Sequence, residues 1–208
     1  MNARSKTRYN ALLVAAQYRN SSPAIRLLLD RGAEVLPPKG QGTPLFSARP
    51  LFLAAYAGNA EILPALKKAG DKVDARMAVL GQEPTTPLSS GAQIGNIDVV
   101  RALLDLGAPV DQGEDVDGGP TALDRAVLGN NLEIAKLLIQ HHANVNHRDN
   151  DGMTPVLYAA SIDFGDSEMI DLLLNSGAKR EARTREGLTA LDLARKYEHT
   201  DLVPSLAR

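Results

Sequence analysis

The feature that most constrains this chain is a short motif that returns along its length at nearly constant spacing. The copies begin at Asn10, Arg49, Thr86, Thr121, Thr154 and Thr189, so that successive copies start 33 to 39 residues apart. A second apolar segment follows each copy. A fixed period of this length indicates a chain built from stacked copies of one supersecondary unit.

The third copy contains all the elements of one unit. Thr86 is a good helix N-cap, because its hydroxyl can accept from unpaired backbone donors, and Pro87 follows where a missing N–H costs nothing. The segment 99–104 places apolar side chains at helical spacing, and Gly107 stands where a left-handed C-terminal cap is expected. The same features recur at Thr154, Pro155, Gly32, Gly70 and Gly177. Each unit is therefore predicted to be helix, turn, helix and extended loop, and only stacked units can bury their apolar faces.

These residues resemble the ankyrin repeat, whose signature is T-P-L-H-x-A with a period of 33 residues. The resemblance runs from about Tyr9 to Arg208, and TPLSSGAQIGNIDVVRALLDLGA, residues 86–108, is a close match. It implies an all-α, ankyrin-type solenoid of six helix-turn-helix repeats in a single domain, residues 1–208. The repeats are placed at about 7–35, 46–74, 83–111, 118–146, 151–179 and 186–208. The last two are similar to ankyrin arrays of bacterial proteins.

The chain departs from the family pattern at the fourth motif position, where the family has histidine. Leu13, Phe52, Ser89, Asp124, Leu157 and Asp192 stand there instead. That histidine makes a structural hydrogen bond in the family, so its absence affects stability more than function. We expect Asp124 and Asp192 to accept from backbone near the start of their helices.

The loops between repeats, called fingers in this fold, lengthen toward the N-terminus. The first finger, residues 34–49, contains a second TPL at 43–45, but counting back from the following helix places the true motif at Arg49. The finger also contains Leu45 and Phe46, which are apolar for a loop. They either cover the N-terminal end of the core or form part of a binding surface, and the sequence leaves both interpretations open.

Composition excludes several classes of function. A net charge of -2 and a pI near 6.1 argue against a nucleic-acid binder, which needs a basic face. The absence of cysteine excludes disulfides, thiolate catalysis and iron–sulfur clusters. No apolar run reaches the ~18 residues of a membrane helix, and Ala11–Ala16 is interpreted as a first helix rather than a signal peptide. A soluble protein without membrane contact is expected, cytoplasmic or exported after loss of a signal.

No pattern of residues predicts catalysis, a cofactor or a metal. A phosphate-binding loop is absent, and the acidic segment 111–119 lacks the ligand alternation of a calcium loop. A metal or small-ligand sensor built from His142, His147 and Asp149 is conceivable, but a solvated helix end and finger is the favoured interpretation. We predict that the protein is not an enzyme.

The resemblance implies that the first helices line a concave surface and that the fingers project beside it. The predicted partner-binding residues are Tyr18, Phe46, Leu53, Tyr56, Met77, Leu80, Gln93, Ile94, Arg125, Leu128 and Tyr158. Tyrosine and arginine supply much of the energy of protein interfaces. We expect a monomer that binds a protein partner there. The alternatives are a groove packed inward on the long fingers, and a structural spacer or inhibitory module of a larger assembly.

Overall fold

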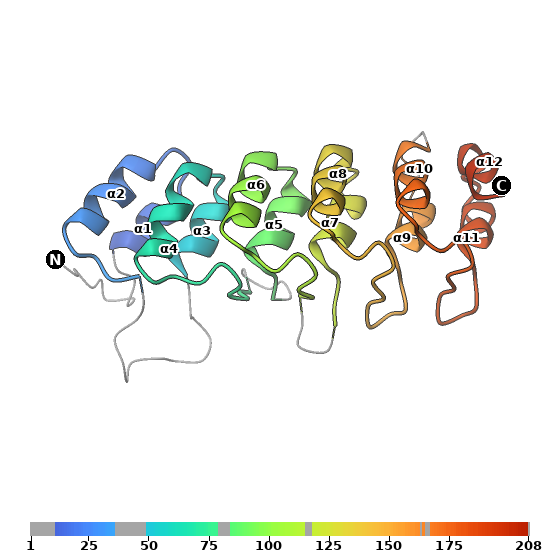
Figure 1. Ribbon diagram of the computed structural model, residues 1–208, viewed down its shortest axis with the longest axis horizontal. Helices are drawn as coiled ribbons and strands as arrows, with labels where there is room; N and C mark the ends of the chain where they lie inside the picture. The colour runs from blue at the N-terminus through green and yellow to red at the C-terminus, as the bar shows by residue number, and fades with distance from the viewer. Residues whose placement is uncertain are drawn as a thin grey trace. The chain divides into compact units, whose positions relative to one another are not determined.

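The computed structural model describes residues 11–35, 49–78, 84–114, 118–162, 164 and 167–207. The regular elements in these ranges are helices, joined by turns and by two isolated antiparallel bridges (Figure 1). Six pairs of helices follow one another within them, as the repeat pattern predicts. Among the described residues, no helix has the length and apolar character needed to cross a bilayer.

The chain divides into two compact units. The N-terminal unit comprises residues up to Gly91 together with Asn96–Pro109, and the C-terminal unit comprises Ala92–Gly95 together with the residues from Val110 onward. The extent of a single domain over residues 1–208 stays a prediction.

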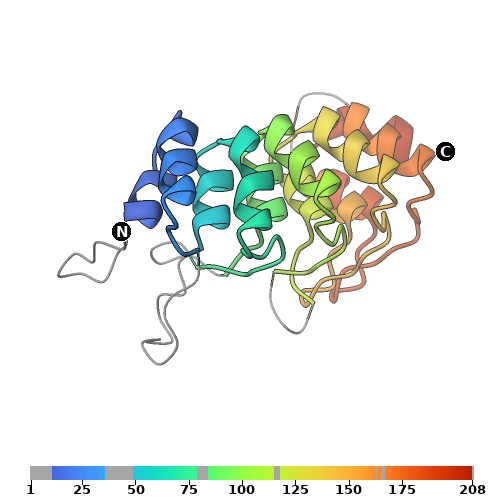
Figure 2. The same cartoon turned by 60° about the vertical axis from the view of Figure 1, so that its left-hand side comes forward.

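The N-terminal unit contains the first three helix pairs, except residues 92–94 at the end of α5. These are α1 (Ala11–Ala16) with α2 (Ser22–Asp30), α3 (Pro50–Tyr56) with η1 (Ala60–Ile62) and α4 (Leu63–Lys68), and α5 (Pro87–Ile94) with α6 (Ile97–Asp105). Helix α1 packs on α2 and on α3, and α4 packs on α6. Among the described residues of this unit the core is aliphatic apart from one ring, and its fully buried members include Leu12, Ile25, Leu51, Phe52, Leu63 and Leu103. The first helices α1 and α3 lie side by side (Figure 2).

The C-terminal unit repeats this arrangement. Its elements are α7 (Ala122–Leu128) with α8 (Leu132–Gln140), α9 (Pro155–Ser161) with α10 (Glu168–Asn175), and α11 (Ala190–Lys196) with η2 (Thr200–Leu202) and α12 (Val203–Leu206). Helix α9 packs between α7 and α11. Buried alanines such as Ala126, Ala159 and Ala160 line these first helices, and small side chains there allow the close approach of neighbours.

The starts of the first helices follow the motif. Arg49 is the N-cap of α3, which confirms the second repeat's start, whereas residues 43–45 lie outside the described residues. The Thr86 hydroxyl accepts from the Ser89 backbone at 3.0 Å, as expected. Thr121 and Thr189 make additional hydrogen bonds, because each forms a capping box with the aspartate at the fourth motif position. This confirms the prediction for Asp124 and Asp192.

Thr154 is an exception among these caps. It occupies the N-cap position of α9, but its side chain makes no capping hydrogen bond, and its hydroxyl is buried without a partner among the described residues. The expectation that this hydroxyl caps the helix is therefore wrong. The backbone geometry of the cap is kept while its hydrogen bond is lost, with φ at -120° and ψ at 163°.

The second helices end in left-handed residues at the predicted glycines. The φ angles are 78° at Gly32, 100° at Gly70, 77° at Gly107 and 93° at Gly177. In the fourth repeat His142 takes this place with φ 66°, a conformation that residues with a side chain rarely adopt. The glycine caps predicted from the repeat are thus confirmed, and the position of His142 identifies a strained exception.

Candidate partner-binding surface

Two tyrosines of the N-terminal unit lie in the open at the ends of neighbouring first helices. Tyr18 follows α1 and is 64% exposed, and Tyr56 ends α3 and is 43% exposed. The Tyr56 ring stacks on the buried Phe52 ring with centroids 6.5 Å apart. The carbonyl of Tyr18 accepts from the Asn59 side chain at 2.8 Å and from the Ser21 hydroxyl at 2.7 Å. The Tyr56 ring is therefore held against the core, whereas Tyr18 is anchored through its backbone and exposes its side chain.

The other predicted residues of this unit are less prominent. Leu53 is half-buried on α3, and Met77 is half-buried in a finger, where its backbone pairs with Thr85 at 2.9 and 3.0 Å. Phe46 and Leu80 lie outside the described residues. Val14, which the site prediction omitted, is 45% exposed on α1. Its place at the fifth motif position, where Leu53 stands in the next repeat, is the signal that could have found it.

The C-terminal unit presents a mixed set. Gln93 and Ile94 are exposed at the end of α5, whereas Leu128 is half-buried at the end of α7. The Asn131 side chain donates to the Ala92 carbonyl at 2.8 Å, which fixes the chain beside them. The prediction again omitted one exposed residue, Tyr197, at the end of α11.

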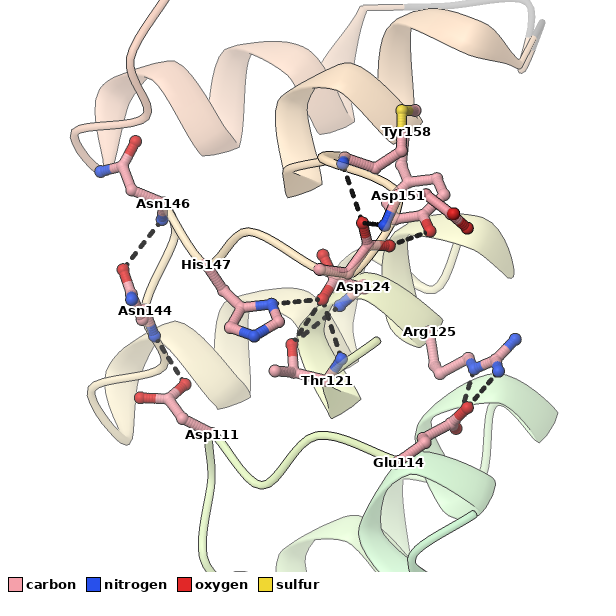
Figure 3. A network of polar contacts seen from close by, with 12 residues as sticks. Asp111, Glu114, Thr121, Asp124, Arg125, Asn144, Asn146, His147, Asp151 and Tyr158 are labelled. Atoms are coloured by element: carbon pink, nitrogen blue, oxygen red, sulfur yellow. Dashed lines mark hydrogen bonds and ion pairs between the residues drawn. The ribbon is translucent and has the colours of Figure 1, made fainter. Parts of the chain in front are cut away.

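Arg125 is half-buried and paired. Its Nε donates to Glu114 Oε1 at 2.8 Å and its Nη2 donates to Glu114 Oε2, so the guanidinium grips the carboxylate with two bonds (Figure 3). Glu114 is itself buried. The hydrogen bond to Glu114 raises the pKa of Arg125. A bidentate pair of this kind fixes both side chains, so Arg125 presents a rigid edge and not a free cation.

Tyr158 is also held from within the chain. Its hydroxyl donates to Asp149 Oδ2, and Asp149 Oδ1 accepts from the backbone of Asp151 at 2.9 Å and of Met153 at 2.8 Å (Figure 3). Burial and the hydrogen bond to Asp149 raise the pKa of Tyr158 far above its usual value. Tyr158 therefore ties α9 to the finger before it, and truncating it removes internal support as well as surface.

The residues considered as metal ligands make hydrogen bonds with different partners and not with one another. His147 Nδ1 lies 3.2 Å from Asp124 Oδ2, while Asp149 serves Tyr158 and the finger backbone. His142 is exposed at the end of α8. Among the described residues no group of three or more histidine and carboxylate side chains is placed to hold a metal ion. Asp111, in the acidic segment, accepts from the Asn144 backbone at 2.8 Å.

Comparison with known proteins agrees with this architecture. The family model for ankyrin repeats in three copies matches residues 51–149 and 123–208. The chain belongs to the ankyrin repeat family. Its helices and fingers form an all-α ankyrin solenoid, the fold that the repeats predict. Ankyrin repeats are in general modules of protein–protein interaction.

Several curated proteins are similar to this chain. An ankyrin repeat protein of Fowlpox virus is 32% identical over 75% of the chain and 46% of its own length. An ankyrin repeat protein of Rickettsia felis is 29% identical over 61% of the chain and 42% of its own length. The RelA-associated inhibitor of Mus musculus is 35% identical over 66% of the chain and 16% of its own length. The chain thus spans less than half the length of these relatives. The similarity to bacterial ankyrin arrays stays a prediction.

Proposed function

We propose that this chain is a non-catalytic module that binds a protein partner through its first helices and fingers. The observation that carries the proposal is the pair of exposed, anchored tyrosines, Tyr18 and Tyr56, at the ends of the adjacent helices α1 and α3. Contiguous exposed apolar surface on a protein is a candidate site of contact with another molecule. Leu53 and Val14 extend the apolar surface along the same two helices.

Tyrosines in this setting are suited to binding. Each offers a large apolar face and one hydroxyl while losing little side-chain entropy on contact, which makes tyrosine frequent among the residues that dominate interface energies. The Phe52 stack reduces that loss further for Tyr56, whose ring is already held, and the Asn59 hydrogen bond fixes the backbone of Tyr18. A partner's apolar side chains would pack against these two rings.

An inhibitory module of a larger assembly is the second candidate. One relative is named an inhibitor associated with RelA, and another is named a regulatory subunit of protein phosphatase 1, at 39% identity over 36% of this chain. Such a role would use the same surface, with the bound partner being the protein that is inhibited. Activity of that partner with and without the chain separates the two functions.

The first prediction concerns these tyrosines. The double variant Tyr18→Ser, Tyr56→Ser is expected to weaken binding of a partner isolated from the source organism by at least about 30-fold, as the loss of a strong interface contact implies. Tyr18 is 64% and Tyr56 43% exposed, so the free energy of unfolding should fall by no more than about 2 kcal/mol, mainly through lost packing of Tyr56 on Phe52. Calorimetric titration with the purified partner and urea unfolding measure the two quantities.

Leu27 provides the matched control. It is 53% exposed, but it lies on the second helix α2 and not on a first helix. Leu27→Ser should leave the affinity within about twofold of wild type, a difference well below 1 kcal/mol. Equal affinity of the double variant and the wild type would reject this surface, and equal losses in the double variant and the control would show that exposed apolar area of any kind causes the binding.

A further inference from the structure

One partly buried histidine–aspartate pair in the C-terminal unit is not explained by the repeat architecture. His147 lies in the finger that joins α8 to α9, and Asp124 lies in the first turn of α7 in the same repeat as α8. Nδ1 of His147 is 3.2 Å from Oδ2 of Asp124, and their side chains are 16% and 0% exposed. The pair therefore fastens the finger to a helix 23 residues earlier in the chain.

The two oxygens of the Asp124 carboxylate differ in their hydrogen bonding. Its Oδ2 also accepts from the Thr121 backbone and the Thr121 hydroxyl, both at 2.8 Å. Its Oδ1 is buried and has no hydrogen-bond partner among the described residues. Removing a carboxylate from water is costly unless other groups compensate its charge. His147 is the group that can supply a positive charge directly on this carboxylate.

The charged groups that act on His147 are carboxylates from three segments. They are Asp124 on α7, Asp149 on the same finger and Asp111 on the preceding finger. The hydrogen bond with Asp124 is the largest influence and raises the pKa of His147, desolvation opposes it, and attraction to Asp149 and Asp111 adds to the rise. The surroundings thus favour the protonated ring.

We propose that the His147–Asp124 pair is a pH-sensitive clip that holds finger 144–153 against α7 while His147 carries its proton. Protonation turns this contact into a charge-assisted hydrogen bond, roughly twice as strong as a neutral one. The same finger contains Asp149, which supports Met153 and Tyr158. Loss of the proton therefore loosens the finger and the start of α9 together. The inference does not depend on partner binding, and its test needs no partner.

The direction of the effect follows from the pKa of His147. Because that pKa is raised above the usual 6.5 in the folded chain, the stabilisation is complete below about pH 6.5. It is lost as the pH rises through the higher folded value. The finger is thus held most firmly in mildly acidic solution.

The first test is a proton titration of the histidine rings by nuclear magnetic resonance. In the wild type His147 should titrate above about 6.5, the usual pKa of a histidine in a model peptide. In Asp124→Asn the charge is removed with little change of shape, so the pKa of His147 should fall, because the hydrogen bond with Asp124 is the largest cause of its rise. A wild-type His147 that titrates at or below about 6.5 overturns the proposal.

The second test measures the finger itself, and it remains available where Asp124→Asn fails to fold. Amide exchange of Asp151 and Met153, corrected for the intrinsic pH dependence of exchange, reports how firmly the finger is held. Wild-type protection should fall between pH 6 and pH 8.5, by up to tenfold for each unit by which the pKa is raised. His147→Gln should show no such fall, and the control His141→Gln should behave like the wild type. Unchanged protection in the wild type, or the same fall in His147→Gln, rejects the clip.

Discussion

At the scale of single residues, the end of α8 carries a backbone conformation that its side chain opposes. His142 has φ 66°, and the residues at the corresponding ends of α6 and α10, Gly107 and Gly177, have φ 77° and 93°. In this left-handed backbone conformation a residue with a Cβ is destabilised by roughly 1 kcal/mol or more. Glycine has no Cβ and avoids this destabilisation. The repeat itself therefore identifies the residue that His142 replaces.

Adding glycine at the end of α8 and removing it at the end of α6 should change the free energy of unfolding in opposite directions. His142→Gly is expected to raise the free energy of unfolding by about 0.5–1 kcal/mol, and Gly107→Ala to lower it by about 1 kcal/mol. The comparison isolates the backbone, because a Cβ at Gly107 would meet no atom within 4 Å. Urea unfolding measures both changes, and a less stable His142→Gly protein would mean that the imidazole supports the helix end.

At the scale of elements, the helix starts differ in how their first turn is satisfied. Thr121 joins Asp124 in a capping box at the start of α7, whereas the Thr154 hydroxyl at the start of α9 is buried without a partner among the described residues. A capping hydroxyl contributes about 1 kcal/mol, and an unsatisfied buried hydroxyl contributes nothing or opposes folding.

The two threonines should therefore respond differently to the same loss. Thr121→Val should lower the free energy of unfolding by about 1–2 kcal/mol, because it also removes a donor from the buried Asp124 carboxylate. Thr154→Val keeps the side-chain shape and removes only the unpaired hydroxyl, so stability should stay the same or rise. Thermal unfolding of the two variants beside the wild type decides the matter, and equal losses would indicate that Thr154 does cap α9 in solution.

The helix pairs were predictable from sequence because the signals for them are local. Thr86 and Pro87 start a helix, and Gly107 ends one, within a few residues of the positions that they control. The contacts in the C-terminal unit were not predictable in this way. Tyr158 with Asp149 and His147 with Asp124 depend on the path of a finger, which has no period. The sequence indicated Tyr158 as a surface residue, and only its contacts identify it as an internal tie.

At the scale of the whole molecule, stacked repeats bury their core through contacts between neighbours, so stability is a sum of units and interfaces. The motif spacing predicted the six helix pairs, which the structure contains. Motif spacing does not predict cooperativity, because it says nothing of the relative strength of units and interfaces. Two compact units exist within the chain, and helix α5 contributes residues to both. The chain therefore unfolds in one transition if α5 couples the stability of the two units.

We expect one cooperative transition, in keeping with the predicted single domain. Leu63→Ala in the N-terminal unit and Leu138→Ala in the C-terminal unit each delete a fully buried side chain and should cost about 2–5 kcal/mol. If α5 couples the units, either variant lowers amide protection in both, because unfolding of one interrupts a helix that the other requires. Amide hydrogen exchange, measured separately for the residues of each unit, distinguishes the outcomes. Loss of protection confined to the unit that carries the substitution would mean two domains, and the proposed tyrosine surface would then belong to the N-terminal one alone.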